Sequence, residues 1–245
     1  MTGTAVSAGR GEGTPTRLPL MRRAMVRQMV LGAAVPCFYL RVTADLTDLL
    51  VARAELKAAA AEGPVPSVND FIVRAAALAL RDHPEVNSSY AEDEIVAHPR
   101  VNVGVAVAVP GGLVVPAVYD ADRLDLTTIT EAVLELVELA ARRKLGRDVL
   151  SDATFTISNL GMYGIEEFDP ILNPPQAAIL AVGAAQEGAD GRRRVRLTLG
   201  CDHRVLTGAE AAPFVTAVRD RLQAPAELLA PTELLAPVGT HDQQE

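Results

Sequence analysis

The sequence predicts an α/β fold in which a mixed β-sheet is flanked by helices. Short runs rich in Val, Ile and Leu alternate with longer amphipathic segments along the 245 residues, an order typical of α/β proteins. Some neighbouring runs are separated only by turn residues, as at Pro110, Gly111 and Gly112. Because short turns join antiparallel strands and helical connections join parallel ones, we expect both kinds of pairing in the sheet.

Apolar periodicity and capping residues predict the helices. The first carries methionines four residues apart with arginines between them, as an amphipathic helix does. Ser67 is placed to cap the third helix, which ends before Pro84. Thr128 and Glu131 form a capping-box pattern that opens the fourth. The expected helices span residues 21–30, 46–61, 68–83, 128–144 and 209–222.

The runs of β-branched and apolar residues predict the strands. The segment 101–120 consists of two Val-rich runs around the turn at Pro110, and its nearly continuous apolar character predicts burial on both faces. A loop rich in Gly and Pro follows residue 160 and extends to about Pro175. The expected strands span residues 37–46, 101–109, 113–120, 153–160, 177–185 and 192–201.

We expect a single folded domain over residues 18–230. Residues 1–17 are rich in Gly, Thr, Ser and Ala without periodicity, which predicts a disordered leader. Residues 231–245 predict a flexible C-terminal tail. Hydrophobic residues make up 49% of the chain, enough for a sizeable core, and Trp is absent. The core is therefore expected to consist of Ala, Val, Leu and Ile.

Charge and cysteine usage exclude several classes of function. The net charge of −8 argues against nucleic acid and anionic membranes as partners. The two cysteines, Cys37 and Cys201, form no CxxC pattern and no cluster with histidine, so no metal site is expected. The chain has no signal-peptide pattern and no apolar run of ~18 residues that could span a membrane. We expect a cytoplasmic protein.

One histidine stands in a position that suits chemistry. The sequence lacks a phosphate-binding GxxxxGK[ST] loop, a GxGxxG fingerprint, an HExxH motif and a GxSxG elbow. Of its four histidines, only His203 follows a strand and precedes a helix. A strand end holds a side chain rigidly and leaves it accessible, which suits a general base. A structural histidine at a strand end is the competing interpretation.

Several blocks of sequence resemble the catalytic domain of the dihydrolipoamide acyltransferases, the E2 components of 2-oxo acid dehydrogenase complexes. The resemblance extends from about residue 20 to 230, with the blocks in the order and at the spacing of that family. The blocks read MRRAMVRQM, PEVNSSY, NVGVAVAVPGGLVVPAV, TFTISNLGMYGIEEFDPILNPPQAAILAVG and DHRVLTGAEAAPF.

The resemblance implies a fold, an assembly and a mechanism. The implied fold is the two-layer fold of chloramphenicol acetyltransferase, in homotrimers with active sites between subunits, and a larger core built from such trimers is a further option. His203 matches the family's catalytic histidine, which takes a proton from the attacking thiol or hydroxyl. Ser158 matches the serine that stabilises the tetrahedral oxyanion. Asn159, Gly161 and Gly208 are candidates for shaping the pocket.

Acetyl-CoA is the implied acyl donor, without a metal, and the sequence does not assign the residues that contact it. Asp202 and Arg204 flank the histidine and are interpreted as scaffold. The basic run from Arg192 to Arg196 is interpreted as a solvated hairpin, with a phosphate contact as the alternative. Cys201 is expected to be a small buried residue without a nucleophilic role.

Thr207 departs from the family pattern DHRxxDG, which has an aspartate four residues after the histidine. A threonine hydroxyl can form hydrogen bonds but carries no charge. The departure leaves three options. Another residue takes over the carboxylate's role, the site has a changed preference, or activity is lost.

The short leader is a second departure, because Met1 is interpreted as a natural start and no lipoyl domain is expected on this chain. The favoured expectation is therefore a stand-alone CoA-dependent O-acetyltransferase. Its acceptor would be a hydroxyl group on a small-molecule or carrier-bound natural product, as in the spirotetronate (tetronate-type) polyketide pathways. The alternatives are a dihydrolipoamide acyltransferase core subunit and a non-catalytic scaffold.

Overall fold

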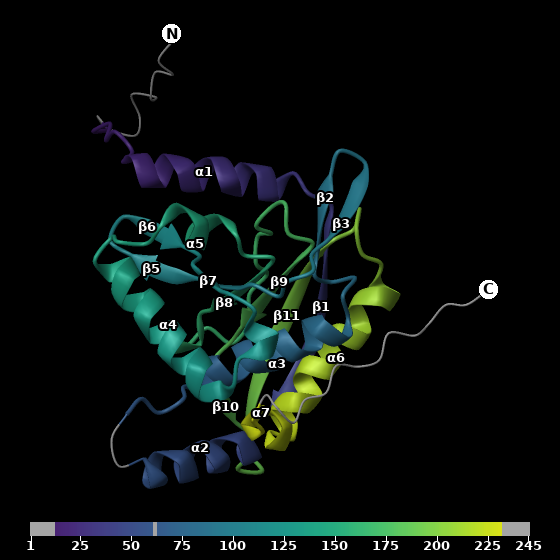
Figure 1. Cartoon of the computed structure of the whole chain (residues 1–245). Helices are drawn as coiled ribbons and strands as arrows, with labels where there is room; N and C mark the ends of the chain where they lie inside the picture. Colours follow the sequence, from purple (N-terminus) through teal and green to yellow (C-terminus); the bar gives the residue numbers. More distant parts are fainter. Residues whose placement is uncertain (1–12, 61–62, 232–245) are drawn as a thin grey trace, which may run out of the picture.

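The computed structural model describes residues 13–60 and 63–231. Most of the expected leader, residues 1–12, and all of the expected tail except Pro231 lie outside the described residues. The described chain forms a mixed sheet with helices packed beside it, which confirms the predicted fold class (Figure 1). The helices are α1 (Leu20–Ala33), α2 (Thr47–Ala59), α3 (Val68–Asp82), α4 (Leu126–Ala141), α5 (Arg147–Ser151), α6 (Gly208–Gln223) and α7 (Ala226–Leu229).

The described strands form one large sheet and two hairpins. The sheet has the order β1-β11-β9-β8-β4-β7, with β10 beside β11, and β2–β3 and β5–β6 are the hairpins. The pairs β9–β8 and β8–β4 are parallel, and the other pairs are antiparallel. The strands are β1 (Cys37–Asp45), β2 (Ser88–Ala91), β3 (Glu94–Ala97), β4 (Val103–Val105), β5 (Val107–Val109), β6 (Gly112–Val114), β7 (Ala117–Val118), β8 (Phe155–Asn159), β9 (Ala178–Val182), β10 (Gln186–Glu187) and β11 (Arg193–Asp202).

The two faces of the sheet have different surroundings. One face, here the helix face, packs against α3 and α6, and the ring of Phe155 lies 5.4 Å from that of Phe214 in α6. The opposite face, here the loop face, is covered by the segment 160–176. Tyr39 donates its hydroxyl hydrogen to the Pro170 carbonyl, and Thr156 donates to Gln176. Side chains that alternate along a strand therefore enter two distinct environments.

The helix face is apolar and buried as the composition predicts. Its side chains come from alternate positions of neighbouring strands and lie within one core with α3 and α6. The residues on this face include Val103, Phe155, Ile157, Ala178, Leu180, Val182, Leu197, Leu199 and Cys201. This core favours the observed register of β8, β9 and β11, because a slip of one residue would turn these side chains to the loop face and put Thr156, Thr198 and Gly200 into the apolar core.

The segment 101–120 differs from its prediction. It was expected to be two strands buried on both faces, but it forms four short strands, of which only β4 and β7 join the large sheet. The hairpin β5–β6 is separate and partly exposed beneath α1 (Figure 1). Pro116, which has no N–H to donate, lies between β6 and β7 and favours a break in pairing there. Composition alone does not show where an apolar run changes sheet.

The start of α4 is a second correction. A capping box of Thr128 and Glu131 was expected, but the helix begins earlier, at Leu126. Its N-cap is Asp125, whose carboxylate accepts a hydrogen bond of 2.8 Å from the Thr128 backbone N–H. The predicted cap of α3 is confirmed, because Ser67 and Asp70 form a reciprocal capping box. Both Asp125 and Thr128 belong to residue types that cap helices, and the sequence does not separate two such residues placed three apart.

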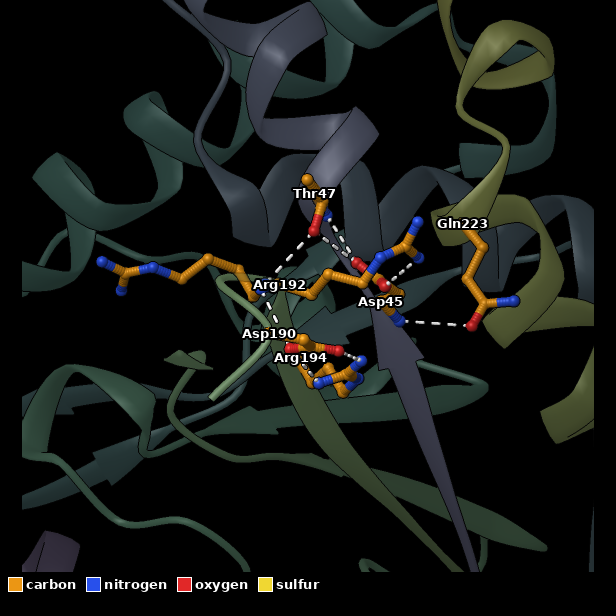
Figure 2. A network of polar contacts seen from close by, with 7 residues as sticks. Asp45, Thr47, Asp190, Arg192, Arg194 and Gln223 are labelled. Carbon is orange, nitrogen blue, oxygen red and sulfur yellow. Dashed lines mark hydrogen bonds and ion pairs between the residues drawn. The ribbon is translucent and has the colours of Figure 1, made fainter. Parts of the chain in front are cut away.

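A polar network ties three elements together at the end of the sheet opposite the C-terminus of β11 (Figure 2). Asp45 at the end of β1 accepts hydrogen bonds from the backbone N–H and the hydroxyl of Thr47, the first residue of α2. The same carboxylate pairs with Arg192 at 2.7 Å, and the Asp45 N–H donates to Gln223 at the end of α6. The network thus fixes the point at which the chain leaves β1 and enters α2.

Candidate active site

His203 lies directly after β11, at the start of the turn that leads to α6, as the sequence predicts. Its side chain is exposed. Its backbone N–H donates to the Pro36 carbonyl at 2.9 Å, and its ring lies 4.7 Å from that of Phe38. Phe38 pairs with Cys201 and therefore belongs to the helix face. An accessible imidazole on a fixed backbone is suited to exchange protons with a bound substrate.

Ser158 lies near the C-terminal end of β8 and is half-buried. It pairs with Ala181 of β9, which in turn pairs with Thr198 of β11. Side chains of directly paired residues share a face, and Thr156 on that face bonds to the covering loop. Ser158 therefore belongs to the loop face.

Within one chain, Ser158 and His203 do not form one site. Ser158 is level with Thr198, two strands away, and His203 lies five residues beyond Thr198 along β11. At about 3.3 Å per residue and 4.8 Å per strand, the two positions are about 19 Å apart. They also belong to opposite faces of the sheet. A hydrogen bond spans about 3 Å, so a reaction that needs both residues needs a second copy of the chain.

The two candidate pocket residues near Ser158 form the turn that follows it. Asn159 accepts a hydrogen bond of 2.8 Å from the Gly161 N–H, and its amide donates to Asn69 of α3. A side chain at Gly161 would place its Cβ only 2.5 Å from the Gly183 carbonyl oxygen. Glycine is therefore required there by close approach of two backbones. Gly208 lies elsewhere, as the first residue of α6, and its position leaves room for a Cβ.

Thr207 is the N-cap of α6. Its hydroxyl accepts a hydrogen bond from the Glu210 N–H at 3.4 Å and donates to the Glu210 carboxylate at 2.8 Å. The Thr207 N–H donates to the same carboxylate at 2.7 Å, which completes a capping box. These bonds lower the pKa of Glu210. The residue that departs from the family pattern thus stabilises the helix that follows His203.

Asp202 and Arg204 form an ion pair with each other on either side of His203. The Asp202 side chain is only 2% exposed, and the Arg204 guanidinium donates to it at 2.6 Å. The hydrogen bond that Arg204 donates to the Asp202 carboxylate is the main cause that raises the pKa of Arg204. This agrees with the interpretation that both residues are scaffold. Arg204 also lies 4.0 Å from the ring centroid of Tyr90, a contact that the sequence did not reveal.

The basic run before β11 has no free guanidinium to offer a phosphate, because each arginine faces a carboxylate. The structure thus agrees with a solvated hairpin. The pairs are Arg192–Asp45, Arg193–Glu187, Arg194–Asp190 and Arg196–Glu167.

The two cysteines, Cys201 and Cys37, are buried and half-buried free thiols. Cys201 is fully buried, as predicted, and burial raises its pKa to about 12, which disfavours the thiolate near neutral pH. Burial also raises the pKa of Cys37. Residues 13–60 and 63–231 contain no group of three or more His, Cys, Asp or Glu side chains that could hold a metal ion. No helix in that part of the chain is long and apolar enough to cross a membrane.

Neither of two clefts beside α1 contains the candidate residues. Two clefts of about 690 and 510 Å³ lie between α1 and the β5–β6 hairpin. They share Met21, Val114 and Leu150, and neither is lined by His203 or Ser158. The sequence identified the candidate residues through their motifs, whereas the contacts that hold His203 depend on Phe38 and Tyr90. Phe38 is placed by its pairing with Cys201, and Tyr90 by the packing of the β2–β3 hairpin against Arg204.

The fold is that of chloramphenicol acetyltransferase, whose solved structure covers 80% of this chain with a TM-score of 0.53 and 14% identity. Two solved structures are more similar, with TM-scores of 0.86 and 32% identity. Each match covers 94% of this chain and 100% of the solved chain. One is the cubic core of the pyruvate dehydrogenase multienzyme complex. The other is the dihydrolipoamide acetyltransferase (E2p) of Azotobacter vinelandii, studied for the catalytic role of a serine, a histidine and an asparagine four residues after that histidine.

The chain belongs to the family of 2-oxoacid dehydrogenases acyltransferases (catalytic domain), whose model matches residues 11–230. A curated relative is the dihydrolipoyllysine-residue acetyltransferase component of the pyruvate dehydrogenase complex of Rhizobium meliloti (strain 1021). It is 37% identical over 222 residues, which cover 85% of this chain and 50% of the relative. The chain thus spans about half the length of that protein. The family predicted from the sequence blocks is confirmed.

Proposed function

We propose that this chain transfers an acyl group between the thiol of a dihydrolipoyl group and that of coenzyme A. The reported relatives are dihydrolipoamide acetyltransferases, so they favour this function, held above as the alternative, over acetylation of a hydroxyl group. The observation that carries the choice of acceptor is this similarity, and the separation of Ser158 and His203 within one chain supports a site shared between two copies. In a homotrimer, Ser158 of one copy and His203 of its neighbour would face each other across the interface.

His203 would act as the general base. A thiol with a pKa near 8.5 is mostly protonated at neutral pH, so the imidazole must remove its proton as the sulfur attacks the thioester carbonyl. The new carbon–sulfur bond forms as the carbonyl π electrons move to oxygen. When the tetrahedral adduct collapses, the original carbon–sulfur bond breaks and the protonated imidazole returns its proton to the leaving sulfur. The histidine ends the cycle unchanged, so one residue serves both directions of transfer.

Ser158 would stabilise the negative oxygen of the tetrahedral adduct. Its hydroxyl donates a hydrogen bond that strengthens as charge develops on the oxygen, which lowers the barrier rather than only improving binding. The loop that begins at Gly161 continues the strand that carries Ser158, and the close contact with Gly183 fixes it. The donor is thus held before substrate arrives, which is the condition for an effective oxyanion site.

The asparagine of the Azotobacter protein, four residues after its histidine, has the same spacing as Thr207 from His203. A residue at this position therefore need not be the aspartate expected from the family pattern. Thr207 shares with asparagine the ability to cap a helix. We propose that the threonine keeps the start of α6, and with it the turn carrying His203, in place without a charge.

The test is a comparison of acceptors with one donor. Purified protein is given acetyl-CoA and either dihydrolipoamide or hydroxylated small molecules, including a tetronate alcohol. The proposal expects transfer to dihydrolipoamide to be much faster, and loss of at least ~10²-fold in kcat/KM for His203→Ala. Faster transfer to an alcohol would replace it with the O-acetyltransferase of a natural-product pathway. No transfer to either acceptor by the wild type would favour the non-catalytic scaffold.

A further inference from the structure

The turn that carries His203 is closed by the side chains on either side of it. The buried Asp202 carboxylate accepts hydrogen bonds of 2.9 Å from both the backbone N–H and Nε of Arg204, and one of 2.6 Å from Nη2. The main chain of His203 lies inside this ring of bonds. An arginine fork that meets a carboxylate with two nitrogens has a fixed orientation as well as a favourable charge.

Tyr90 supports the outer side of this ion pair. The Arg204 guanidinium carbon lies 4.0 Å from the centroid of the Tyr90 ring, within the range of a cation–π contact. Tyr90 is itself fixed at two points. Its N–H donates to the Pro175 carbonyl and its hydroxyl donates to Asp93 at 2.8 Å. The β2–β3 hairpin therefore lies against the His203 turn.

The remaining bonds of the turn leave His203 little freedom in its backbone. Its N–H donates to Pro36, and the N–H groups of Val205 and Leu206 both donate to the Asp202 carbonyl. The ring itself is exposed and touches Phe38 on one side. The frame of the turn therefore fixes the direction in which the His203 side chain leaves the backbone, and the Phe38 ring bounds its imidazole on one side.

We propose that Asp202, Arg204 and Tyr90 form a positioning chain that holds the imidazole of His203 in its reactive orientation. The inference rests on the proposed role of His203 and adds residues that act through it. None of the three needs to touch substrate. A displacement of about 1 Å in a catalytic group can cost about 10²-fold in rate, so a support of this kind affects turnover even where binding is unchanged.

The proposed contacts need the planar guanidinium of Arg204 and the aromatic ring of Tyr90, and a positive charge alone would not replace them. Lysine would keep the positive charge of Arg204 but cannot form the planar fork or stack flat on a ring. Phenylalanine would lose the hydroxyl bond to Asp93 but keep the ring on Arg204 and the backbone bond to Pro175, which still holds the hairpin in place. If the positioning chain acts as proposed, Arg204→Lys and Tyr90→Leu should have a lowered turnover number. Tyr90→Phe should be close to the wild type.

The experiment measures kcat and KM for acyl transfer in the full-length chain. Arg204→Ala and Tyr90→Leu are expected to lower kcat by about 10- to 100-fold, with KM unchanged within about twofold. Arg142→Ala is the matched control, because Arg142 forms an exposed ion pair with Glu138 on α4. Thermal unfolding and assembly size are recorded for each variant, and Arg204→Lys serves where Arg204→Ala does not fold.

Combining Arg204→Ala with His203→Ala separates a positioning role of Arg204 from a general contribution to stability. In His203→Ala, which retains only the residual rate, Arg204→Ala is expected to add no further loss, because the chain acts through the missing ring. Equal losses in both backgrounds, or a raised KM at constant kcat, would overturn the positioning chain. If His203→Ala itself matches the wild type, the proposed function fails instead, so the two failures are distinguishable.

Discussion

At the residue scale, the position of His203 suits a general base. Ser158, the proposed oxyanion donor, is not within reach of it in the same chain. His203 is exposed, lies at the end of a strand and has a fixed backbone. Replacing it with alanine removes the proposed proton acceptor and leaves the surrounding bonds, which are made by main-chain groups and by Asp202 and Arg204. We therefore expect at least ~10²-fold loss of kcat/KM with little change in stability. A histidine of structural importance alone would show the reverse pattern in steady-state kinetics and urea unfolding.

Ser158→Ala gives the complementary prediction for the oxyanion. Its loss removes one hydrogen-bond donor without creating a large cavity, because the side chain is small and half-buried. We expect kcat to fall by about 10²–10³-fold while KM stays near its wild-type value. Thr156→Val, a nearby hydroxyl that bonds to Gln176, is the comparison for a hydroxyl with a structural role. A similar loss of kcat in both variants would remove the specific role of Ser158.

Thr207 gives a prediction about stability. Alanine at this position removes the side-chain half of the capping box with Glu210, so the free energy of unfolding should fall by about 1 kcal/mol. Asparagine caps helices at least as well and should preserve stability. Urea unfolding of Thr207→Ala and Thr207→Asn measures both effects. Equal destabilisation by the two substitutions would show that capping is not what Thr207 contributes.

At the element scale, the network around Asp45 predicts how stability depends on pH. The bonds from Thr47, together with the ion pair to Arg192, lower the pKa of Asp45 from 3.8 to about 2. A carboxylate whose pKa is lower in the folded state stabilises the fold above about pH 4, and this contribution is lost as the pH falls toward 2. Asp45→Asn should therefore lose less stability than the wild type between pH 5 and pH 3, measured by urea unfolding. An identical loss would contradict the network's role.

The elements also show what a sequence carries and what it does not. The alternation of apolar residues along β11 is visible in the sequence, and the Ser67 cap of α3 follows from local chemistry. Both are short-range signals. The division of the segment 101–120 between the large sheet and the β5–β6 hairpin depends on distant partners such as β8, and the sequence pattern is the same in either case. The contact between Tyr90 and Arg204 likewise depends on two segments that are distant in the sequence.

The candidate site shows this limit most clearly. Motif blocks were enough to select His203 and Ser158, because the residues next to each of them in the sequence match a block of the family. They did not show that the two residues lie on opposite faces and about 19 Å apart in one chain, since that depends on the order β8-β9-β11. Trimers with interfacial sites were expected only from the resemblance. If both residues act in one reaction, the strand order requires them to come from different copies.

At the scale of the whole molecule, the central claim is that each active site takes Ser158 from one copy and His203 from another. The most direct measurement mixes the inactive variants Ser158→Ala and His203→Ala by co-expression and isolates the mixed assemblies. In a symmetric ring, some interfaces then unite the intact serine of one chain with the intact histidine of the other. Every mixed trimer has one such interface among its three, so the isolated mixed assemblies should have about one third of wild-type activity. Mixed assemblies no more active than either variant alone would contradict a shared site.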